Sequence, residues 1–413
     1  MVEQPENRPT LTTQQAAGRL GVKPETLYAY VSRGLIGRVR APDGKGSLYA
    51  AADVDALAAR SGRAPAARAG AEPSGIDTAL TLIADDHLYF RGRDATELAA
   101  GYTFESVAEW LWTGEQPPFP HFEAPPAALA AARTAAEALP PRARVTDHFR
   151  AAVTAAAVAD PLRFDIQPAS VLVAARTMIA AMVAAAPRTA GGPDRPGAGI
   201  AELLWPRLTA RPATADGLRA LGGALVLLAD HDMAASTYAA RIAASTRAHP
   251  YAVVATGLAV LEGPMHGGAG ALAHRLLADA TSSGDPVGVV ADRLRDGGAE
   301  PGFVPGFGHL IYQRRDPRAE ALLRLVEPLS DPDGVRPAAE GLLTVGRDRL
   351  GSFPNVDFAL AVLSQLCGFA AGAEEAVFAV ARSAGWLAHA MEEYRAPAVR
   401  HRPQGHYTGA LPG

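Results

Sequence analysis

The sequence predicts an all-α protein with a large helical body preceded by a small helix-turn-helix domain. Alanine and leucine supply most of the hydrophobic fraction of 48%, whereas aromatic residues make up only 6%; this balance favours packed helices over sheets. At 413 residues the chain exceeds the usual size of one domain, so more than one core is expected. A stretch rich in Ala, Gly, Pro and Ser predicts a flexible linker at 61–75, after an N-terminal domain at 1–60.

Residues 11–36 have the spacing of a helix-turn-helix. Thr13 can cap a first helix, Gly21 ends it in a tight turn, and Pro24 suits the first turn of a second helix. Apolar residues fall at the inward positions of the two helices, namely Ala16, Ala17, Leu20, Leu27 and Val31. A short arm with a DG turn follows, and the whole module resembles the winged, MerR-type or excisionase-like helix-turn-helix domains.

This module is basic, unlike the rest of the chain. Residues 1–70 carry ten Lys/Arg and six Asp/Glu, a net charge of +4, while the remaining residues sum to −8. We expect DNA binding, with second-helix side chains in a groove and arm arginines on phosphates: Lys23, Tyr28, Tyr30, Arg33, Arg38 and Arg40. A charge of +4 is only modestly basic, so a protein-interaction domain of the same shape is the alternative.

Three segments of the body each place one titratable side chain beside glycine or proline. They read GPMHGGAG with His266, VPGFGHLIYQRRDPR with His309, and FPNVDF with Asp357. Glycine and proline let the backbone bend and bring such a side chain close to a ligand. A carboxylate can remove a proton near neutral pH, and imidazoles can donate hydrogen bonds to oxygens where negative charge develops. The three residues therefore predict a site for proton chemistry.

These strings resemble the citrate synthase family. Further matching strings lie on both sides, GIDTALTLIADDHLYFRGRDATELAAGYTFESVAEWLWTGEQPP at 75–118, ADHDMAASTYAARIAAST at 229–246 and RPQGHYTG at 402–409. Together they run from residue 75 to the C-terminal end in the family's order. The resemblance implies a large helical domain at 76–266 and 369–413, a small domain at 267–368 that closes on it, and a homodimer.

The resemblance also implies the reaction, a condensation of acetyl-CoA with oxaloacetate followed by hydrolysis of the citryl thioester. Asp357 is then the base that removes a methyl proton, and its apolar neighbours Val356 and Phe358 favour a raised basicity. His266 donates to the thioester oxygen, and His309 polarises the keto group of oxaloacetate and protonates the alkoxide.

Oxaloacetate is a dianion, and arginine matches a carboxylate with two parallel donors. By resemblance, Arg318, Arg382 and Arg402 bind it together with His231, and Arg402 reaches into the partner subunit's site. A surface ion pair is the commoner fate of a single arginine. Arg382, however, lies in a mostly apolar helical pattern, where an unpaired charge is costly.

The sequence predicts the CoA site less clearly, because the chain has no P-loop and no G-x-G-x-x-G after a strand. The backbone at Val304, Gly306 and Gly308 is expected to meet the adenine, and Arg314 and Arg315 the phosphates. Either arginine can equally be a solvated surface charge. We expect no metal and no permanently bound cofactor, since acetyl-CoA or propionyl-CoA is a substrate. The histidines without a matching role are read as structural or surface residues: His274, His389, His401 and His406.

Two positions depart from the family pattern. Ala234 and Gly270 stand where the family usually has Asn, which removes an amide that can orient a histidine or hold a water. Rate and substrate preference are therefore open. One alternative is a 2-methylcitrate synthase that uses propionyl-CoA. Another is a DNA-binding regulator whose synthase-like body senses a metabolite, although a pure sensor has no need of a base.

Composition points to a cytoplasmic protein that does not interact with membranes. The chain has one cysteine, Cys367, in an apolar run, which predicts a buried thiol and a reducing compartment. Its N-terminus shows no apolar signal segment, and its apolar runs are too short to span a bilayer.

Overall fold

The computed structural model describes residues 10–20, 22, 24–32, 35–40, 47–51, 53–54, 57, 76–118, 120–189, 192–295, 303–398, 401 and 409. The chain divides into two compact units, Met1–Asp77 and Thr78–Gly413. The predicted linker at 61–75 lies outside the described residues.

The elements with described bounds in the first unit are β1 (Thr10–Thr12), α1 (Thr13–Leu20), α2 (Pro24–Ser32), β2 (Arg38–Arg40) and β3 (Ser47–Ala50). The strands pair antiparallel in the order β1-β3-β2. The core contains the predicted inward residues Ala16, Ala17, Leu20 and Leu27, joined by Tyr49 from β3. Thr12 caps α1 in place of the predicted Thr13, because the Gln15 N–H donates to its hydroxyl oxygen (3.3 Å) while the Thr12 N–H donates to the Gln15 side chain (2.9 Å).

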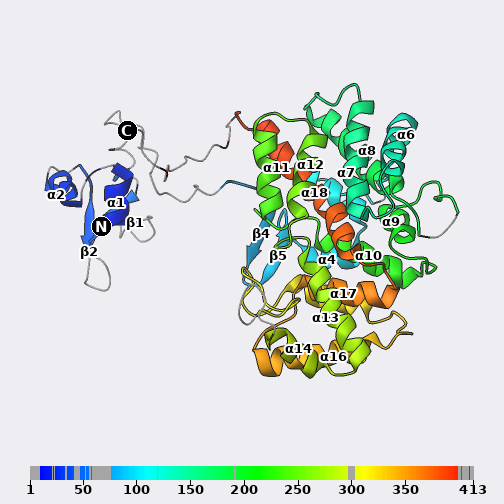
Figure 1. The fold of residues 1–413 in the computed structure, drawn as a ribbon. Coiled ribbons are helices and arrows are strands. Elements are labelled where there is room, and N and C mark those ends of the chain that lie inside the picture. Colours follow the sequence, from blue (N-terminus) through cyan, green and yellow to red (C-terminus); the bar gives the residue numbers. More distant parts are fainter. Residues whose placement is uncertain are drawn as a thin grey trace. The chain divides into compact units, whose positions relative to one another are not determined.

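The second unit is predominantly helical, as the sequence predicts (Figure 1). Its first group of helices is α4 (Ala95–Gly101), α5 (Phe104–Thr113), α6 (Pro126–Glu137), α7 (Val145–Ala159), α8 (Pro168–Ala185), α9 (Ile200–Leu208), α10 (Ala215–Leu227), α11 (Ala235–Ser245) and α12 (Pro250–Leu261). The remaining helices are α13 (Ala269–Ser283), α14 (Pro286–Arg295), α15 (Pro317–Val326), α16 (Val335–Val345), the π-turn η1 (Gly346–Leu350), α17 (Val356–Cys367) and α18 (Ala373–Arg395).

Helix α18 is the centre of this unit. It has 23 residues, is buried along most of its length and packs against α5, α8, α10, α11 and α12. Trp386 is fully buried where α18 crosses α12. Among the described helices, α8 is the one long and apolar enough to cross a membrane by length and composition, but 61% of it is buried inside the fold. A core helix of a soluble protein has the same properties.

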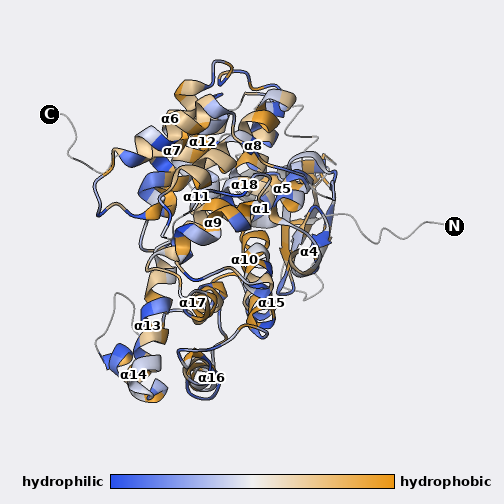
Figure 2. Ribbon diagram, turned by 90° about the vertical axis from the view of Figure 1, so that its right-hand side faces the viewer, coloured by the Kyte–Doolittle hydropathy of each residue, from blue (hydrophilic) through white to orange (hydrophobic). Residues whose placement is uncertain are grey.

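A second group of helices packs around α17. Helices α13 and α15 contact α17 directly, and α16 contacts α13 and α14 (Figure 1). In Figure 2, α17 is mostly hydrophobic and α14 mostly hydrophilic, which fits the burial of α17 and the exposure of α14. Cys367 ends α17 in a buried position, and burial raises its pKa to about 12, so the predicted buried thiol is confirmed.

The body also contains a small antiparallel sheet, which the sequence analysis did not predict. Strands β4 (Thr81–Ala84), β5 (His87–Phe90) and β6 (Arg93–Asp94) pair in that order. Asp85 and Asp86 form the two-residue turn between β4 and β5 with φ values of 51° and 59°. Aspartate tolerates this left-handed conformation, and the resulting turn matches the twist of a hairpin. The alternation of buried Leu88 and Phe90 with more exposed neighbours was the missed strand signal.

Candidate active site

His309 lies in the turn before α15, and a backbone hydrogen bond determines which of its ring nitrogens carries the hydrogen. Its Nδ1 accepts a hydrogen bond from the Ile311 N–H at 3.0 Å. The neutral ring therefore carries its hydrogen on Nε2. Burial lowers the pKa of His309 to about 4, with the charge of Arg318 acting in the same direction and Asp316 against it. At neutral pH His309 is a neutral donor.

Arg318 stands in the first turn of α15 and is held by Asp316. The Asp316 carboxylate caps the helix, accepting from the Arg318 N–H at 3.0 Å, and also accepts from Nε at 2.9 Å and Nη2 at 2.8 Å. Both residues are almost completely buried. Arg318 Nη2 lies 3.4 Å from His309 Nε2. Because both nitrogens are donors when His309 is neutral, they cannot satisfy each other and are free to share an acceptor oxygen.

His231 follows α10 and is buried against two aromatic rings. Its Nε2 lies 3.0 Å from the Tyr312 hydroxyl, and its ring makes an edge contact with His309 at 5.4 Å between centroids. Burial lowers the pKa of His231 well below its ordinary value, and nearby Arg318 and Arg382 lower it further. His231 is therefore neutral as well.

Arg382 lies in the middle of α18 with only 1% of its surface exposed. Its Nε donates to the Leu228 carbonyl at 2.9 Å. Its Nη1 is buried and has no hydrogen-bond partner among the described residues. Burial lowers the pKa of Arg382 to about 10, the charge of Asp230 opposes this shift and that of Arg318 adds to it. A buried guanidinium with an unused donor is a binding group for an anion.

His266 lies in the loop between α12 and α13. Its Nε2 is 2.7 Å from the Ser236 hydroxyl, which also accepts from the indole N–H of Trp386 at 3.2 Å. The Ser236 hydroxyl keeps its own hydrogen while it accepts from the indole, so it can donate this hydrogen to Nε2; in that arrangement His266 carries its hydrogen on Nδ1. Burial and the charge of Arg382 lower the pKa of His266 to about 4.

Asp357 lies in the first turn of α17. The cap residue Asn355 accepts from the Asp357 N–H at 3.0 Å, which fixes the start of the helix. Burial raises the pKa of Asp357 to about 6; Arg318 opposes the shift, and Asp316 and Glu374 add to it. A carboxylate that binds its proton near neutral pH is suited to act as a general base.

These residues come together from several elements. Burial is the largest cause of the lowered pKa of His231, and the charges of four neighbours lower it further: Arg318, Arg382, His309 and His266. The charge of Asp357 in turn raises the pKa of Arg318. Direct contacts join three of them, because Arg318 Nη2 lies 3.4 Å from His309 Nε2 and the His309 ring makes an edge contact with that of His231. A surface depression of about 770 Å³ lies elsewhere, between α6 and α7, and none of these residues lines it.

The predicted CoA loop is tied to the segment before α17. Gly306 and Gly308 adopt φ values of 85° and 75°, which glycine permits. The Gly308 N–H donates to the Phe353 carbonyl at 2.8 Å, and the Gly306 carbonyl accepts from the Asn355 N–H at 2.9 Å. Val304 is buried at the start of this loop.

Arg314 and Arg315 connect the site loop to the β4–β5 hairpin. Arg314 is mostly exposed and donates from Nε to Asp86 at 3.2 Å. Arg315 pairs with Glu320 at 2.9 Å and contacts His87 at 3.0 Å. Both side chains therefore have partners within the protein.

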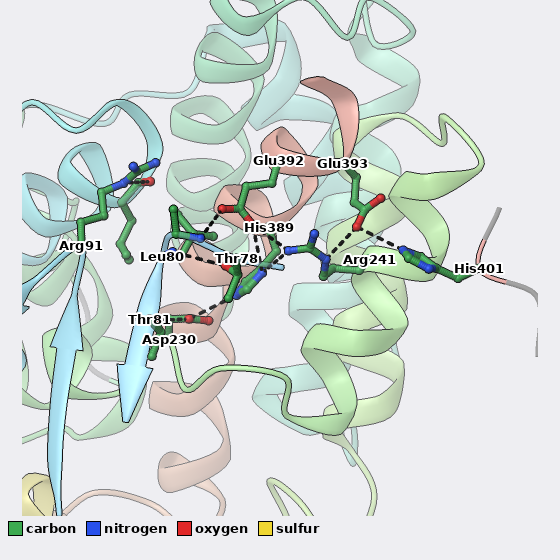
Figure 3. Close-up of polar contacts among 12 residues, drawn as sticks. Thr78, Leu80, Thr81, Arg91, Asp230, Arg241, His389, Glu392, Glu393 and His401 are labelled. Carbon is green, nitrogen blue, oxygen red and sulfur yellow. Dashed lines mark hydrogen bonds and ion pairs between the residues drawn. The ribbon is translucent and has the colours of Figure 1, made fainter. Parts of the chain in front are cut away.

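A buried polar network begins at Asp230, the residue before His231 in the sequence (Figure 3). The neighbouring Asp230 accepts from the Thr81 hydroxyl and lies 3.2 Å from His389 Nε2. Arg241 donates to His389 Nδ1 at 2.8 Å, which places the hydrogen of the neutral ring on Nε2, toward Asp230.

The network continues to the C-terminal segment. Arg241 pairs with Glu392 and Glu393, each at 2.7 Å, and Glu393 contacts His401 at 3.2 Å. His274, His389 and His401 are all held by protein groups, consistent with the structural role predicted for them.

Several predicted residues lie outside the described residues, namely Arg402, His406, Lys23 and Arg33. The side chains of Tyr28 and Arg40 are likewise not described, whereas Tyr30 is half-buried and Arg38 exposed.

Four site residues were missed from the sequence: Tyr312, Asp316, Ser236 and Trp386. Asp316 was detectable, since Asp before Pro at the start of a helical pattern predicts a cap. The other three contact the site only through the tertiary fold.

Comparisons with known proteins agree with this geometry. A family model described as citrate synthase, C-terminal domain, matches residues 73–404. Citrate synthase 2 of Bacillus subtilis is 27% identical over 80% of this chain and 93% of its own length. The citrate synthase of Haloferax volcanii is 37% identical over 45% of this chain and 49% of its own length. The chain spans about half the length of this curated citrate synthase and of three others that it matches.

A solved structure is also similar, the citrate synthase of Thermoplasma acidophilum in a ternary complex with carboxymethyl coenzyme A and oxaloacetate. It has a TM-score of 0.71 and 26% identity, covering 82% of this chain and 95% of that one. The family model covers most of the chain, the fold is shared and the histidines, arginines and carboxylate lie together: this chain belongs to the citrate synthase family.

Proposed function

We propose that this protein is a citrate synthase that condenses acetyl-CoA with oxaloacetate and hydrolyses the citryl thioester. The observation that carries the proposal is the group formed by Asp357, with a raised pKa, two neutral histidines and two buried arginines. The ligands of the T. acidophilum relative, a CoA derivative and oxaloacetate, are of the same chemical classes.

Oxaloacetate binds between Arg318, Arg382 and His231. The unused Nη1 of Arg382 receives one carboxylate oxygen, and Arg318, already oriented by Asp316, receives another. The keto oxygen accepts from His309 Nε2. Neutral histidines suit this role because they add donors without a further charge beside the arginines.

The ring nitrogens that carry hydrogen in His266 and His309 determine which groups these histidines can donate to. Asp357 removes a proton from the acetyl methyl group, while His266 Nδ1–H stabilises the thioester oxygen as it becomes an enol oxygen. The methyl carbon forms a bond to the keto carbon of oxaloacetate, and His309 gives its Nε2 hydrogen to the resulting alkoxide. Water hydrolyses the thioester, which releases citrate and the CoA thiol.

The test is oxaloacetate-dependent thiol release from acetyl-CoA by wild type and Asp357→Ala. We expect the substitution to reduce kcat by about 10²–10⁴-fold, the usual contribution of a general base. Asp292→Ala, on the exposed face of α14, is the control and is expected to keep wild-type activity. Lack of thiol release by the folded wild type with acetyl-CoA and with propionyl-CoA contradicts the enzyme proposal and favours a metabolite-sensing regulator.

Propionyl-CoA is the alternative acyl substrate, which makes the enzyme a 2-methylcitrate synthase. One methylene in an apolar pocket changes selectivity by only about 1–3 kcal/mol. The ratio of kcat/KM for the two thioesters therefore decides between them.

The first unit is proposed to be a winged helix-turn-helix domain that binds DNA. Support comes from α1 and α2, joined by three residues, and from the antiparallel strands that follow. Fluorescence anisotropy with promoter DNA is expected to detect binding by the full chain. Lys23→Ala combined with Arg33→Ala should weaken it without affecting thiol release; unchanged DNA affinity contradicts the assignment.

The predicted large domain (76–266 and 369–413) and small domain (267–368) complete the proposal, together with a cytoplasmic homodimer. The Arg402 guanidinium is proposed to enter the partner subunit's oxaloacetate site. Support comes from the resemblance of RPQGHYTG at 402–409 to the C-terminal arginine segment of the family.

A further inference from the structure

Glu374 is a buried carboxylate that the reaction above does not use. It lies in the first turn of α18 and is only 2% exposed. The second residue of α13, Gly270, faces it closely: a Cβ on Gly270 would lie 2.9 Å from Glu374 Cβ and 3.7 Å from Asp357 Oδ1. Glu374 and Asp357 therefore both border the space that a side chain at position 270 would occupy.

The two oxygens of Glu374 have different surroundings. Oε1 lies 2.6 Å from Nδ1 of His274, which is on α13 one turn after Gly270. Oε2 is buried and lacks a hydrogen-bond partner among the residues that the structure describes. The backbone carbonyl of His274 accepts from the Gln365 side chain of α17 at 2.9 Å, which ties this part of α13 to α17. The carboxylate is thus held in place on one side only.

Charged groups reach Asp357 from three neighbouring helices. Asp316 and Arg318 come from the start of α15, Glu374 from α18, and α13 contributes His274 through its contact with Glu374. Arg318 favours the ionised form of Asp357, whereas the two carboxylates favour the protonated form. Burial is the largest cause of the raised pKa of Asp357, and Glu374 acts together with burial and Asp316 against the charge of Arg318.

We propose that Glu374, anchored by His274, is a positioning residue that keeps Asp357 basic enough to remove the substrate proton. It acts through the field of its carboxylate and does not touch the reacting atoms. The space for it exists because position 270 is glycine. The inference rests on the proposed condensation only for its catalytic consequence, because the effect on Asp357 exists without turnover.

The test is the pH profile of kcat/KM for wild type, Glu374→Gln and Glu374→Asp. Glutamine keeps the shape but removes the charge, so the acid limb should move to lower pH, with a lower plateau rate. Aspartate keeps the charge and should restore the wild-type limb. Glu375→Gln is the matched control, because this neighbouring carboxylate pairs with Arg144 instead.

A second measurement separates this inference from the proposed function. The carboxyl ¹³C resonance of Asp357, identified by its loss in Asp357→Asn, reports the same titration without substrates. We expect the midpoint to fall in Glu374→Gln and to stay in Glu375→Gln. An unchanged midpoint in folded Glu374→Gln overturns the inference even if the enzyme is active, and a shifted midpoint supports it even if no thiol is released.

Discussion

At the scale of single residues, the partner of each ring nitrogen decides what each histidine can do. His309 accepts a backbone N–H on Nδ1, and His266 receives the Ser236 hydroxyl on Nε2. The free hydrogens are consequently on opposite nitrogens of the two rings. Each ring can donate to a different oxygen of the two substrates.

Replacement of Ser236 tests this arrangement. Ser236→Ala removes the group that fixes the tautomer of His266, and we expect kcat to fall about five- to tenfold, equivalent to about 1 kcal/mol for one hydrogen bond. Steady-state thiol release measures it. Ser364→Ala, also buried but in α17, should leave kcat unchanged. Equal rates for Ser236→Ala and wild type would show that Ser236 does not orient His266.

The same histidines make stability depend on pH. His266 and His309 have folded pKa values of about 4, against an ordinary value of 6.5, and that of His231 is also lowered. Between about pH 4 and 6.5 the unfolded chain therefore binds more protons at these rings, so the free energy of unfolding falls as pH falls. The raised pKa values of Asp357, Glu105, Asp232 and Glu375 act in the opposite direction, so the contribution of the histidines is measured by replacing them.

Urea unfolding measures this effect. We expect a lower midpoint at about pH 4.5 than at about pH 7. The difference should shrink in a variant with His266→Asn and His309→Asn. A variant that keeps the full difference argues that other groups cause the loss of stability.

At the scale of elements, the site is built where helices begin. Asp316 caps α15, Asn355 caps α17, and His266 precedes α13, so short loops with glycine or proline deliver each group. These signals are local, which is why the sequence could single out His266, His309 and Asp357 as candidates. Tyr312, Ser236 and Glu374 were not, because their roles depend on packing between helices distant in the chain.

The α11–α18 contact gives a prediction for the buried network. Arg241→Leu removes the partner of Glu392, Glu393 and His389. Breaking buried ion pairs from one side costs about 3–5 kcal/mol, so we expect a loss of that size in the free energy of unfolding. Arg219→Leu, which breaks an exposed pair on α10, should cost less than about 1 kcal/mol. Similar losses in both variants would contradict a special role for the network.

At the scale of the whole molecule, the predominantly helical body was predictable from alanine-rich composition, whereas the β4–β6 sheet was not. Three short strands leave little trace in the overall composition, and their role is local. The β4–β5 turn holds the loop after His309 through Asp86, which accepts from the Gln313 N–H at 2.7 Å.

A mixing experiment tests the proposed dimer. Asp357→Ala and Arg402→Ala chains should each be nearly inactive as homodimers. After dissociation and random reassociation, about half of the dimers are hybrids, and each has one complete site, so about a quarter of wild-type activity should return. No recovery, with hybrids verified by mass spectrometry, would argue that Arg402 acts within its own chain.

Asp316 carries a consequence for how such a protein can change during evolution. The one carboxylate caps α15, orients Arg318 and accepts the Val356 N–H at the start of α17 at 3.0 Å. Arg318, proposed to bind oxaloacetate, and the start of the helix that carries Asp357, the proposed base, are therefore held by the same carboxylate. A mutation that adjusts one must disturb the other, so new substrate preferences are more accessible through residues such as Gly270, where a side chain can be gained without moving this anchor, provided that Glu374 changes with it.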